Sequence, residues 1–182
     1  FSEFKASGLL EQGLWLSVNC SVHQFEDEAF AELIINMLAQ HAFPPKQLVL
    51  ELTETALMQN PELTRQQLQV LRKAGISIAV DDFGAGYSSI QYLKQLPVTH
   101  LKIDIDFVKD VAIDKDDAAI VKAIYGMGVI LNLKIIAEGI ETEAIHKGLK
   151  PYREILGQGF HYAKPMPIDA LVAFATGRTK QN

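Results

Sequence analysis

Short apolar segments that end in polar residues alternate along this chain with segments of helical spacing. The apolar segments are rich in residues that favour strands, whereas the others repeat apolar residues every three or four positions. We predict helices around 30–38, 62–74 and 120–127. We predict six strands, at 14–19, 48–52, 76–82, 100–104, 133–138 and 155–160.

The alternation of strand and helix indicates the fold class. Near-continuous apolar strands separated by amphipathic helices are typical of a parallel sheet that helices cover, with right-handed crossovers. We therefore expect an α/β fold. Two architectures fit the pattern, an open doubly wound sheet and a closed barrel.

Side chains with metal-ligand or acid–base chemistry stand at or near the carboxyl end of each predicted strand. Residues at these ends converge in α/β folds, and carboxylates gathered there would repel one another without cations. Oxygen donors favour Mg²⁺ or Mn²⁺ over zinc, and two such ions suit in-line attack on a phosphodiester. Lys102 could then orient the attacking water or help to deprotonate it. In chain order the residues are Asn19, Glu51, Asp81 with Asp82, Lys102 with Asp104, Glu138 and Gln158.

Each of these residues also has a structural interpretation. A single Asp or Glu after a strand is more often a turn or helix-cap residue. Thr53 or Glu54 could belong to a capping box, and Lys102 could pair with Asp104 on the strand face that both share. We favour metal binding because the polar residues recur in register at all the strand ends. We interpret Glu51 as a ligand and Glu54 as support for a loop.

Other catalytic patterns are weak or absent in the sequence. Gly84-x-Gly86 after a strand is similar to a dinucleotide-binding loop, but two acids precede it where pyrophosphate would approach. The same acids, 81 and 82, could instead cap the following helix. The sequence has no HExxH pair, P-loop or Gly-x-Ser-x-Gly elbow. Zinc-protease and covalent nucleophilic chemistry are therefore not indicated.

Composition bounds the remaining classes of function. The chain has 182 residues, 48% of them apolar, and a net charge of −5. We expect one domain, 1–182, that does not bind DNA. Cys20 is the only cysteine and no apolar run approaches the roughly 18 residues of a membrane span, so we expect a cytoplasmic location. The chain begins at Phe1 instead of Met, so we expect it to be a piece of a longer protein.

Six ordered motifs resemble the signature of EAL domains, a family of cyclic di-GMP phosphodiesterases. The resemblance spans residue 14 to about residue 168, and the six motifs together are far more specific than any one of them. The motifs are 18–21 (VNCS), 50–54 (LELTE), 81–89 (DDFGAGYSS), 101–104 (LKID), 137–142 (AEGIET), and 158–160 (QGF) followed by 164–165 (KP).

The resemblance implies a modified TIM barrel that cleaves one phosphodiester bond of cyclic di-GMP to give linear pGpG. By the same resemblance, Asn19, Glu51 and Asp81 bind a first metal ion. Asp81, Asp82 and Glu138 then serve a second ion.

The resemblance also implies roles for the residues around these ligands. Asp104 is expected to support the metal and water network, and Lys102 to contact the nucleophilic water. Gln158 is expected near the substrate. Glu54 and Glu141 are expected to support the loop after Asp82, which in the family links metal binding to dimer contacts.

The sequence departs from the family pattern at several points. No Glu-Ala-Leu motif precedes the asparagine strand, although its glutamate is a further ligand of the first metal in the family. A full barrel has eight strands and typically about 250 residues, so we expect about six of the eight strands here. The open sheet edges would need cover from other residues, a partner chain or a rearrangement. Ala85 stands where the family usually has Thr, and Ile105-Asp106 replace a common Arg-Ser pair.

Three hypotheses of function follow from these observations. The first is a cyclic di-GMP phosphodiesterase with two Mg²⁺ or Mn²⁺ ions, inhibited by Ca²⁺, acting as a homodimer with upstream sensory or regulatory domains. The second is a catalytically inactive cyclic di-GMP receptor, because loss of one ligand can remove activity and leave nucleotide binding. The third, a Mg²⁺-dependent barrel enzyme with another phosphorylated substrate, rests on the fold alone.

Overall fold

A six-stranded parallel sheet forms the centre of the computed structural model, which describes residues 1–84 and 90–179. The strands lie in the order of the sequence, so each crossover moves one step in the same direction. A doubly wound sheet would reverse at a switch point, and this consecutive order is that of a TIM-type barrel. The strands are β1 (Leu16–Asn19), β2 (Leu48–Thr53), β3 (Ser77–Phe83), β4 (His100–Ile103), β5 (Lys134–Ala137) and β6 (Leu156–Gly157).

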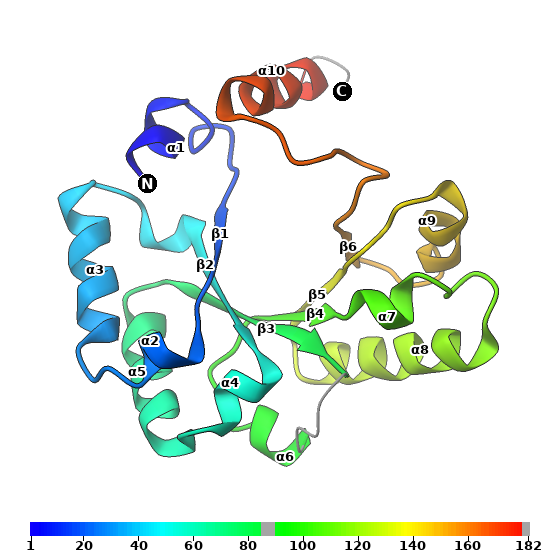
Figure 1. Ribbon diagram of the computed structural model, residues 1–182, viewed down its shortest axis with the longest axis horizontal. Helices are drawn as coiled ribbons and strands as arrows, with labels where there is room; N and C mark the ends of the chain where they lie inside the picture. Colours follow the sequence, from blue (N-terminus) through cyan, green and yellow to red (C-terminus); the bar gives the residue numbers. More distant parts are fainter. Residues whose placement is uncertain (85–89, 180–182) are drawn as a thin grey trace.

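Helices follow the strands and lie outside the sheet (Figure 1). The three predicted helices are confirmed as α3, α5 and α8, each extending beyond the predicted segment at one end or both. The helices are α1 (Ser2–Ala6), α2 (Val22–Phe25), α3 (Phe30–Gln40), the 3₁₀ turn η1 (Pro45–Gln47), α4 (Glu54–Met58), α5 (Pro61–Lys73), α6 (Ile90–Leu93), α7 (Ile105–Val108), α8 (Lys115–Ile130), α9 (Glu143–Leu149) and α10 (Ile168–Thr179).

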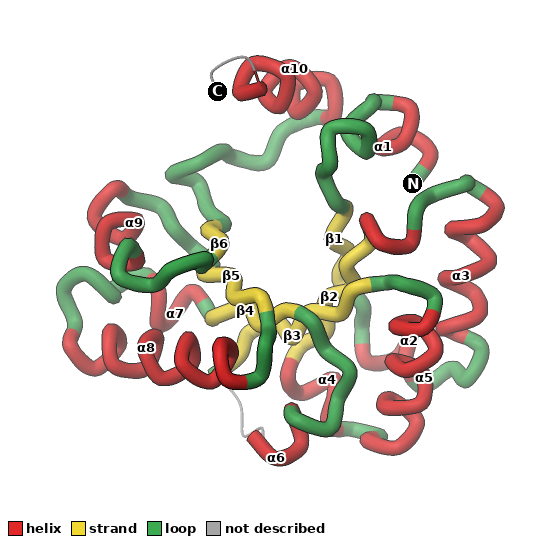
Figure 2. Tube along the Cα trace, turned by 180° about the vertical axis from the view of Figure 1, so that it is seen from behind, coloured by secondary structure: helices red, strands yellow, loops and turns green. Residues whose placement is uncertain are grey.

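The sheet curls into an arc, with β1 and β6 at its two ends (Figure 2). The fold is therefore a curled half-barrel covered by helices, which agrees with the predicted TIM-type architecture and its six strands. Both end strands are short, and β6 has only two of the residues predicted for it at 155–160. In the described part of the chain, the side chains of β1 beyond Leu16 and those of β6 are exposed.

The hydrophobic core lies between the helices and the outer side of the sheet. Alternate strand residues pack there, and Leu50, Leu101 and Ile103 are each at most 1% exposed. The amphipathic helices supply the opposite side of this core, for example Leu68 of α5 and Val121 of α8. Successive side chains of a strand point to opposite faces, so the residues that alternate with these core residues face the inner side of the sheet.

A tight glycine turn connects α5 to β3. Gly75 follows α5 with φ +96°, and the N–H groups of Gly75 and Ile76 donate to the carbonyls of Arg72 and Leu71. This pair of bonds is a Schellman motif, which ends the helix and leads directly into β3. The predicted glycine loop continues into residues 85–89, which lie outside the described residues. No helix in the described ranges has both the length and the apolar character needed to cross a membrane.

Candidate active site

The register of the sheet puts the predicted polar residues on one face. Residues paired across parallel strands point to the same side. Asn19 pairs with Glu51, Glu51 with Ala79, and Ala79 with His100. Counting by twos from these pairs places Asp81 and Lys102 on the same inner face. The pairs Lys102–Ile136 and Ile136–Leu156 extend this face to the positions of Glu138 and Gln158.

An irregularity in β3 brings two adjacent acids to this face. Val80 pairs with Leu101 and Phe83 with Ile103, so β3 has one residue more than β4 over this stretch. Such a bulge changes the direction of a strand's side chains, and Asp82 adopts φ +52° within it. As a result, carboxylate oxygens of Asp81, Asp82 and Glu138 all lie within 4.8 Å of one another. Backbone strain of this kind is typical of functional sites.

Lys102 lies at the centre of the acidic cluster. Its Nζ atom is 2.7 Å from Glu51 Oε2, 2.7 Å from Asp81 Oδ1 and 2.8 Å from Glu138 Oε1. These three carboxylates come from three different strands, and Lys102 is only 2% exposed. Burial by itself lowers the pKa of Lys102, but its hydrogen bonds to the three carboxylates outweigh that effect and raise the pKa above the ordinary value. Lys102 is therefore a fixed positive charge.

Two carboxylates of the cluster, those of Glu138 and Asp82, have pKa values above the ordinary range. Burial raises the pKa of Glu138 to about 7, although the hydrogen bond from Lys102 opposes the shift. The pKa of Asp82 is also raised, first by burial and then by the negative charges of Asp81 and Asp104. A single ammonium group therefore does not balance this cluster, and a further cation would stabilise the ionised carboxylates.

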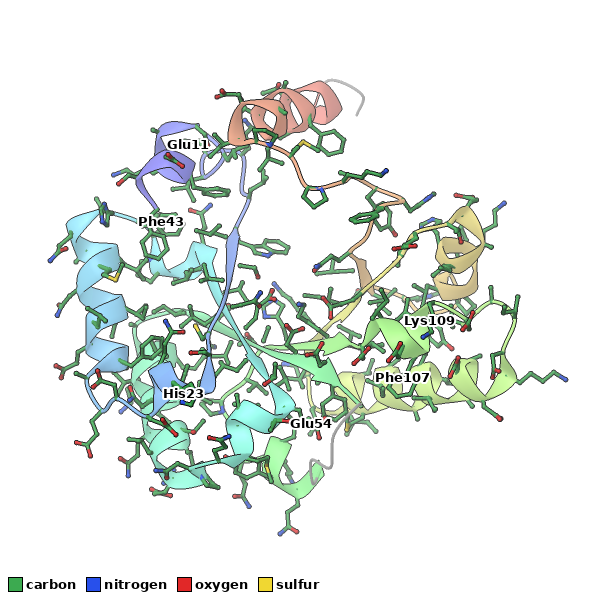
Figure 3. The ribbon with its side chains drawn as sticks, in the orientation of Figure 1. Glu11, His23, Phe43, Glu54, Phe107 and Lys109 are labelled. Atoms are coloured by element: carbon green, nitrogen blue, oxygen red, sulfur yellow. The ribbon has the colours of Figure 1, made fainter. Side chains whose placement is uncertain are left out.

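Two buried acids support the elements around the cluster. Asp104, 8% exposed, caps α7 by accepting a hydrogen bond from the N–H of Asp106 at 2.8 Å. Glu54, 4% exposed, lies between α4 and the end of β3 (Figure 3) and accepts a hydrogen bond from the N–H of Gly84 at 3.3 Å. Glu54 thus contacts the beginning of the loop that it was predicted to support. The alternative pairing of Lys102 with Asp104 is not among the salt bridges of the described residues.

Three of the predicted residues lie at the margins of the cluster. Asn19 is exposed at the end of the edge strand β1, beside Glu51. Gln158 is held by its backbone, whose N–H donates to Ala137 and whose carbonyl accepts from Ile140, while its side chain is exposed. Glu141 is exposed after β5 and lies beyond the turn that follows Glu138. The structure therefore gathers Glu51, Asp81, Asp82, Lys102 and Glu138 most closely.

A close backbone approach beside Glu138 was not singled out from the sequence. Gly139 has φ +67°, and a Cβ atom there would overlap the side chain of Ile105. Only glycine meets both requirements without strain. Ile105, at the beginning of α7, thereby packs over the turn that follows Glu138 and remains 44% exposed. The sequence did contain a signal for this close approach, because a glycine directly follows the candidate ligand Glu138.

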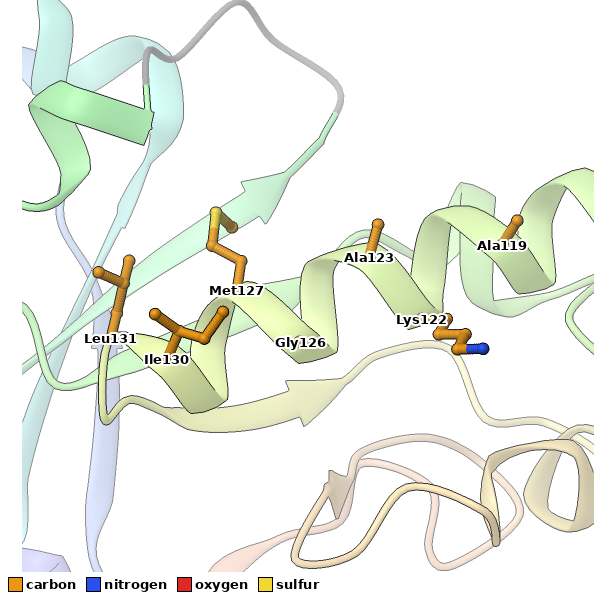
Figure 4. Close-up of a pocket in the computed structure, with 7 residues that line it drawn as sticks. All are labelled: Ala119, Lys122, Ala123, Gly126, Met127, Ile130 and Leu131. Carbon is orange, nitrogen blue, oxygen red and sulfur yellow. The ribbon is translucent and has the colours of Figure 1, made fainter.

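An apolar groove on α8 is separate from the acidic cluster (Figure 4). It has a volume of about 600 Å³ and contains none of the predicted site residues. Its lining residues are Ala119, Lys122, Ala123, Gly126, Met127, Ile130 and Leu131.

The donor set of the cluster fits hard divalent cations. All the converging ligand atoms are oxygens, and Asp81, Asp82 and Glu138 approach closely enough to share ions. Carboxylate oxygens suit Mg²⁺ and Mn²⁺. Such an arrangement at the carboxyl ends of barrel strands can bind a phosphorylated substrate and hold water against it.

Comparisons with known proteins identify a family and several relatives of this chain. The EAL domain family matches residues 1–165. The chain is 44% identical over 158 residues to the bifunctional diguanylate cyclase/cyclic di-GMP phosphodiesterase MucR of Pseudomonas aeruginosa. The aligned region covers 87% of this chain and 23% of MucR. The chain thus spans about a quarter of the length of this curated relative.

Solved structures with the same fold include complexes with nucleotide and metal. The MucR phosphodiesterase in complex with cyclic di-GMP has a TM-score of 0.86 and 40% identity, covering 93% of this chain and 70% of that chain. The EAL domain of Mycobacterium smegmatis DcpA has a TM-score of 0.90 and 31% identity, covering 97% and 80%. BlrP1 of Klebsiella pneumoniae, solved with manganese and cyclic di-GMP, has a TM-score of 0.79 and 30% identity, covering 89% and 42%.

Proposed function

The chain belongs to the EAL domain family, and we propose that it hydrolyses one phosphodiester bond of cyclic di-GMP to give linear pGpG. The observation that carries the proposal is the meeting of Glu51, Asp81 and Glu138 around Lys102 at the carboxyl ends of three strands. Burying these charges costs stability, so their presence favours a function that uses them over nucleotide binding alone.

We propose that two Mg²⁺ or Mn²⁺ ions bind at this cluster. Asn19, Glu51 and Asp81 would hold one ion, and Asp81, Asp82 and Glu138 the other, with Asp104 in support. Bound there, such ions would neutralise phosphate charge and make water a better nucleophile. The convergence of the carboxylate oxygens of Asp81, Asp82 and Glu138 supports this assignment. We expect Ca²⁺ to bind but to inhibit, because its longer and looser coordination would position water poorly.

The chain's own residues supply the proton chemistry. Lys102 Nζ carries three protons and can donate one hydrogen bond to water once a carboxylate releases it. The Glu138 carboxylate, when ionised, would accept a proton from water. Glu54 would hold the loop after Asp82 through Gly84, with Glu141 as a second support, and Gln158 would lie beside the substrate. These roles are part of the proposal.

The test is the Mg²⁺-dependent conversion of cyclic di-GMP to pGpG, followed by chromatography, for this chain and for its full-length parent. We expect turnover that EDTA abolishes, that Ca²⁺ does not support, and that Glu51→Gln removes. Glu62→Gln is a matched control, because Glu62 is exposed and paired with Arg65 on α5. Binding of cyclic di-GMP by the parent without any turnover would replace this proposal by the receptor hypothesis.

The assembly is a further part of the proposal. Since the chain covers 23% of MucR, we propose that upstream sensory or regulatory domains accompany it and that it works as a homodimer in the cytoplasm. A single cysteine, buried and free, fits a reducing compartment. Light scattering of the parent at micromolar concentration tests the dimer, and a monomer that retains full activity would contradict it.

A further inference from the structure

Lys102 occupies the position that a metal ion would be expected to share. Its Nζ atom lies 2.7 to 2.8 Å from oxygens of Glu51, Asp81 and Glu138. These are three of the proposed metal donors, and they come from β2, β3 and the end of β5. Only 2% of Lys102 is exposed, so the three carboxylates, rather than bulk water, surround its charge.

A divalent ion and this ammonium group would compete for the same three carboxylates. Mg²⁺ takes oxygens at about 2.0–2.1 Å in a nearly octahedral shell, which is tighter than any contact that an ammonium group makes. Two like charges about 4 Å apart also repel strongly in a partly buried site. The ion and Lys102 therefore cannot both keep all three carboxylates in their present positions.

We propose that Lys102 is an internal counter-cation that holds the metal-binding carboxylates together when no metal is bound, and that it releases at least one of them when a divalent ion binds. The proposal rests on the metal site proposed above. It gives Lys102 a positioning role in addition to any contact with water, and it makes metal binding a rearrangement within a preformed site.

The same arrangement explains how the chain can fold before it meets a metal. Buried carboxylates without a partner are strongly destabilising, and removal of one member of a buried ion pair leaves the others uncompensated. With Lys102 present, Glu51, Asp81 and Glu138 each have a charged partner. The cost of this arrangement is a lower affinity for metal, since the ion must displace a bound cation.

The first test measures Mn²⁺ affinity and thermal stability for the chain and for Lys102→Met. Lys109→Met is the matched control, because Lys109 is an exposed lysine paired with Asp106 in the same region. We expect Lys102→Met to lower Tm in EDTA, to gain more in Tm from Mn²⁺ than the unmodified chain, and to bind Mn²⁺ about tenfold more tightly by calorimetry. Lys109→Met should match the unmodified chain in all three.

A residue with only a structural role would lower Tm equally with and without metal. Equal Mn²⁺ affinities and equal Mn²⁺-induced Tm shifts in Lys102→Met and the unmodified chain would therefore overturn the proposal. A Lys102→Met variant that folds only with Mn²⁺ would support it, because the ion would then be supplying the missing charge.

The second test needs no variant. Crystal structures of the unmodified chain, grown in EDTA and with Mn²⁺, give the distances from Lys102 Nζ to the three carboxylates. We expect at least one of them to lengthen beyond hydrogen-bond distance with Mn²⁺, and retention of all three would overturn the proposal. This result is independent of the proposed function. A chain in which Mn²⁺ displaces Lys102 but which does not hydrolyse cyclic di-GMP would contradict the proposed function and still support the role of Lys102.

Discussion

The two faces of β4 are buried to a similar degree but differ in chemistry. On the outer face, Leu101 and Ile103 are 0% exposed and pack into the helix-covered core. On the inner face of the same strand, His100 and Lys102 are 4% and 2% exposed. Burial alone therefore does not separate residues that stabilise the fold from residues that form the site.

The difference lies in how each face compensates for burial. Apolar side chains gain roughly 25 cal/mol for each Å² removed from water, whatever their neighbours. Buried charges are tolerated only with partners of opposite charge at short distance, and such networks add little net stability. Substitutions on the outer face should thus alter stability more than activity. Substitutions on the inner face should alter activity more than stability.

The largest expected effect is the loss of activity in Asp81→Asn. The amide keeps the size of the side chain but removes one negative charge from the cluster and one partner of Lys102. We expect activity to fall by more than about a hundredfold, because even residues outside the ligand set affect metal sites by 10- to 100-fold. The measurement is pGpG formation alongside Tm, and Asp106→Asn, on exposed α7, is the control. Retention of activity would remove Asp81 from the site.

Leu101→Ala should reduce stability and leave the activity nearly unchanged. Leu101 neighbours Lys102 in β4 but faces the core, so truncation leaves a cavity. We expect the free energy of unfolding to fall by about 3 kcal/mol, with the activity per folded molecule nearly unchanged. Urea denaturation gives the first quantity and active-site titration the second. A specific loss of activity without a loss of stability would contradict the division between the faces.

Gly139→Ala should destabilise the turn after Glu138. The added methyl group meets Ile105, and alanine tolerates φ +67° poorly. We expect a loss of about 2 kcal/mol in the free energy of unfolding. The double variant Gly139→Ala/Ile105→Ala tests the overlap, because it removes the contacts with Cγ1 and Cδ1 of Ile105, while the contact with the Cβ of residue 105 and the backbone strain remain. Gly126→Ala is the control, since a Cβ there meets no atom within 4 Å.

The smallest expected effect at neutral pH comes from His100, which affects stability only as the pH falls. Burial lowers the pKa of His100 from 6.5 to about 4, and the charges of Lys134 and Arg72 add to the shift. Between these values the unfolded chain binds a proton that the folded chain does not, so stability is fully present above pH 6.5 and falls toward pH 4. A shift of this size corresponds to a loss of up to about 3 kcal/mol across this window.

The His100→Gln variant tests this pH dependence because it removes the titrating group. The difference in unfolding free energy between the unmodified chain and His100→Gln should be constant above pH 6.5 and should change as the pH falls to about 4. A constant difference over the whole window would show that His100 does not cause the effect.

Much of the fold could be predicted from local patterns. Apolar runs and helical spacing predicted six strands and the helices α3, α5 and α8, all of which occur, whereas α10 was not predicted. The short helices α4 and α7 were missed, because they begin at strand ends whose acids were read mainly as ligands. Thr53 and Asp104 are the N-caps of these helices, so the helix-cap interpretation holds for Asp104, whereas Thr53 caps α4 without the proposed capping box because Ala56 stands at N3.

The sequence by itself determined which residues face each side of the sheet, because strand periodicity is a local property of the chain. It thereby indicated that acids of several strands would share one edge. Tertiary structure decided the consecutive strand order, the bulge that turns Asp82 toward Asp81, and the three partners of Lys102. These features depend on distances between segments that are up to 51 residues apart in the case of Lys102 and Glu51. Local periodicity does not predict such distances, because they depend on how the strands pair and how the sheet curls.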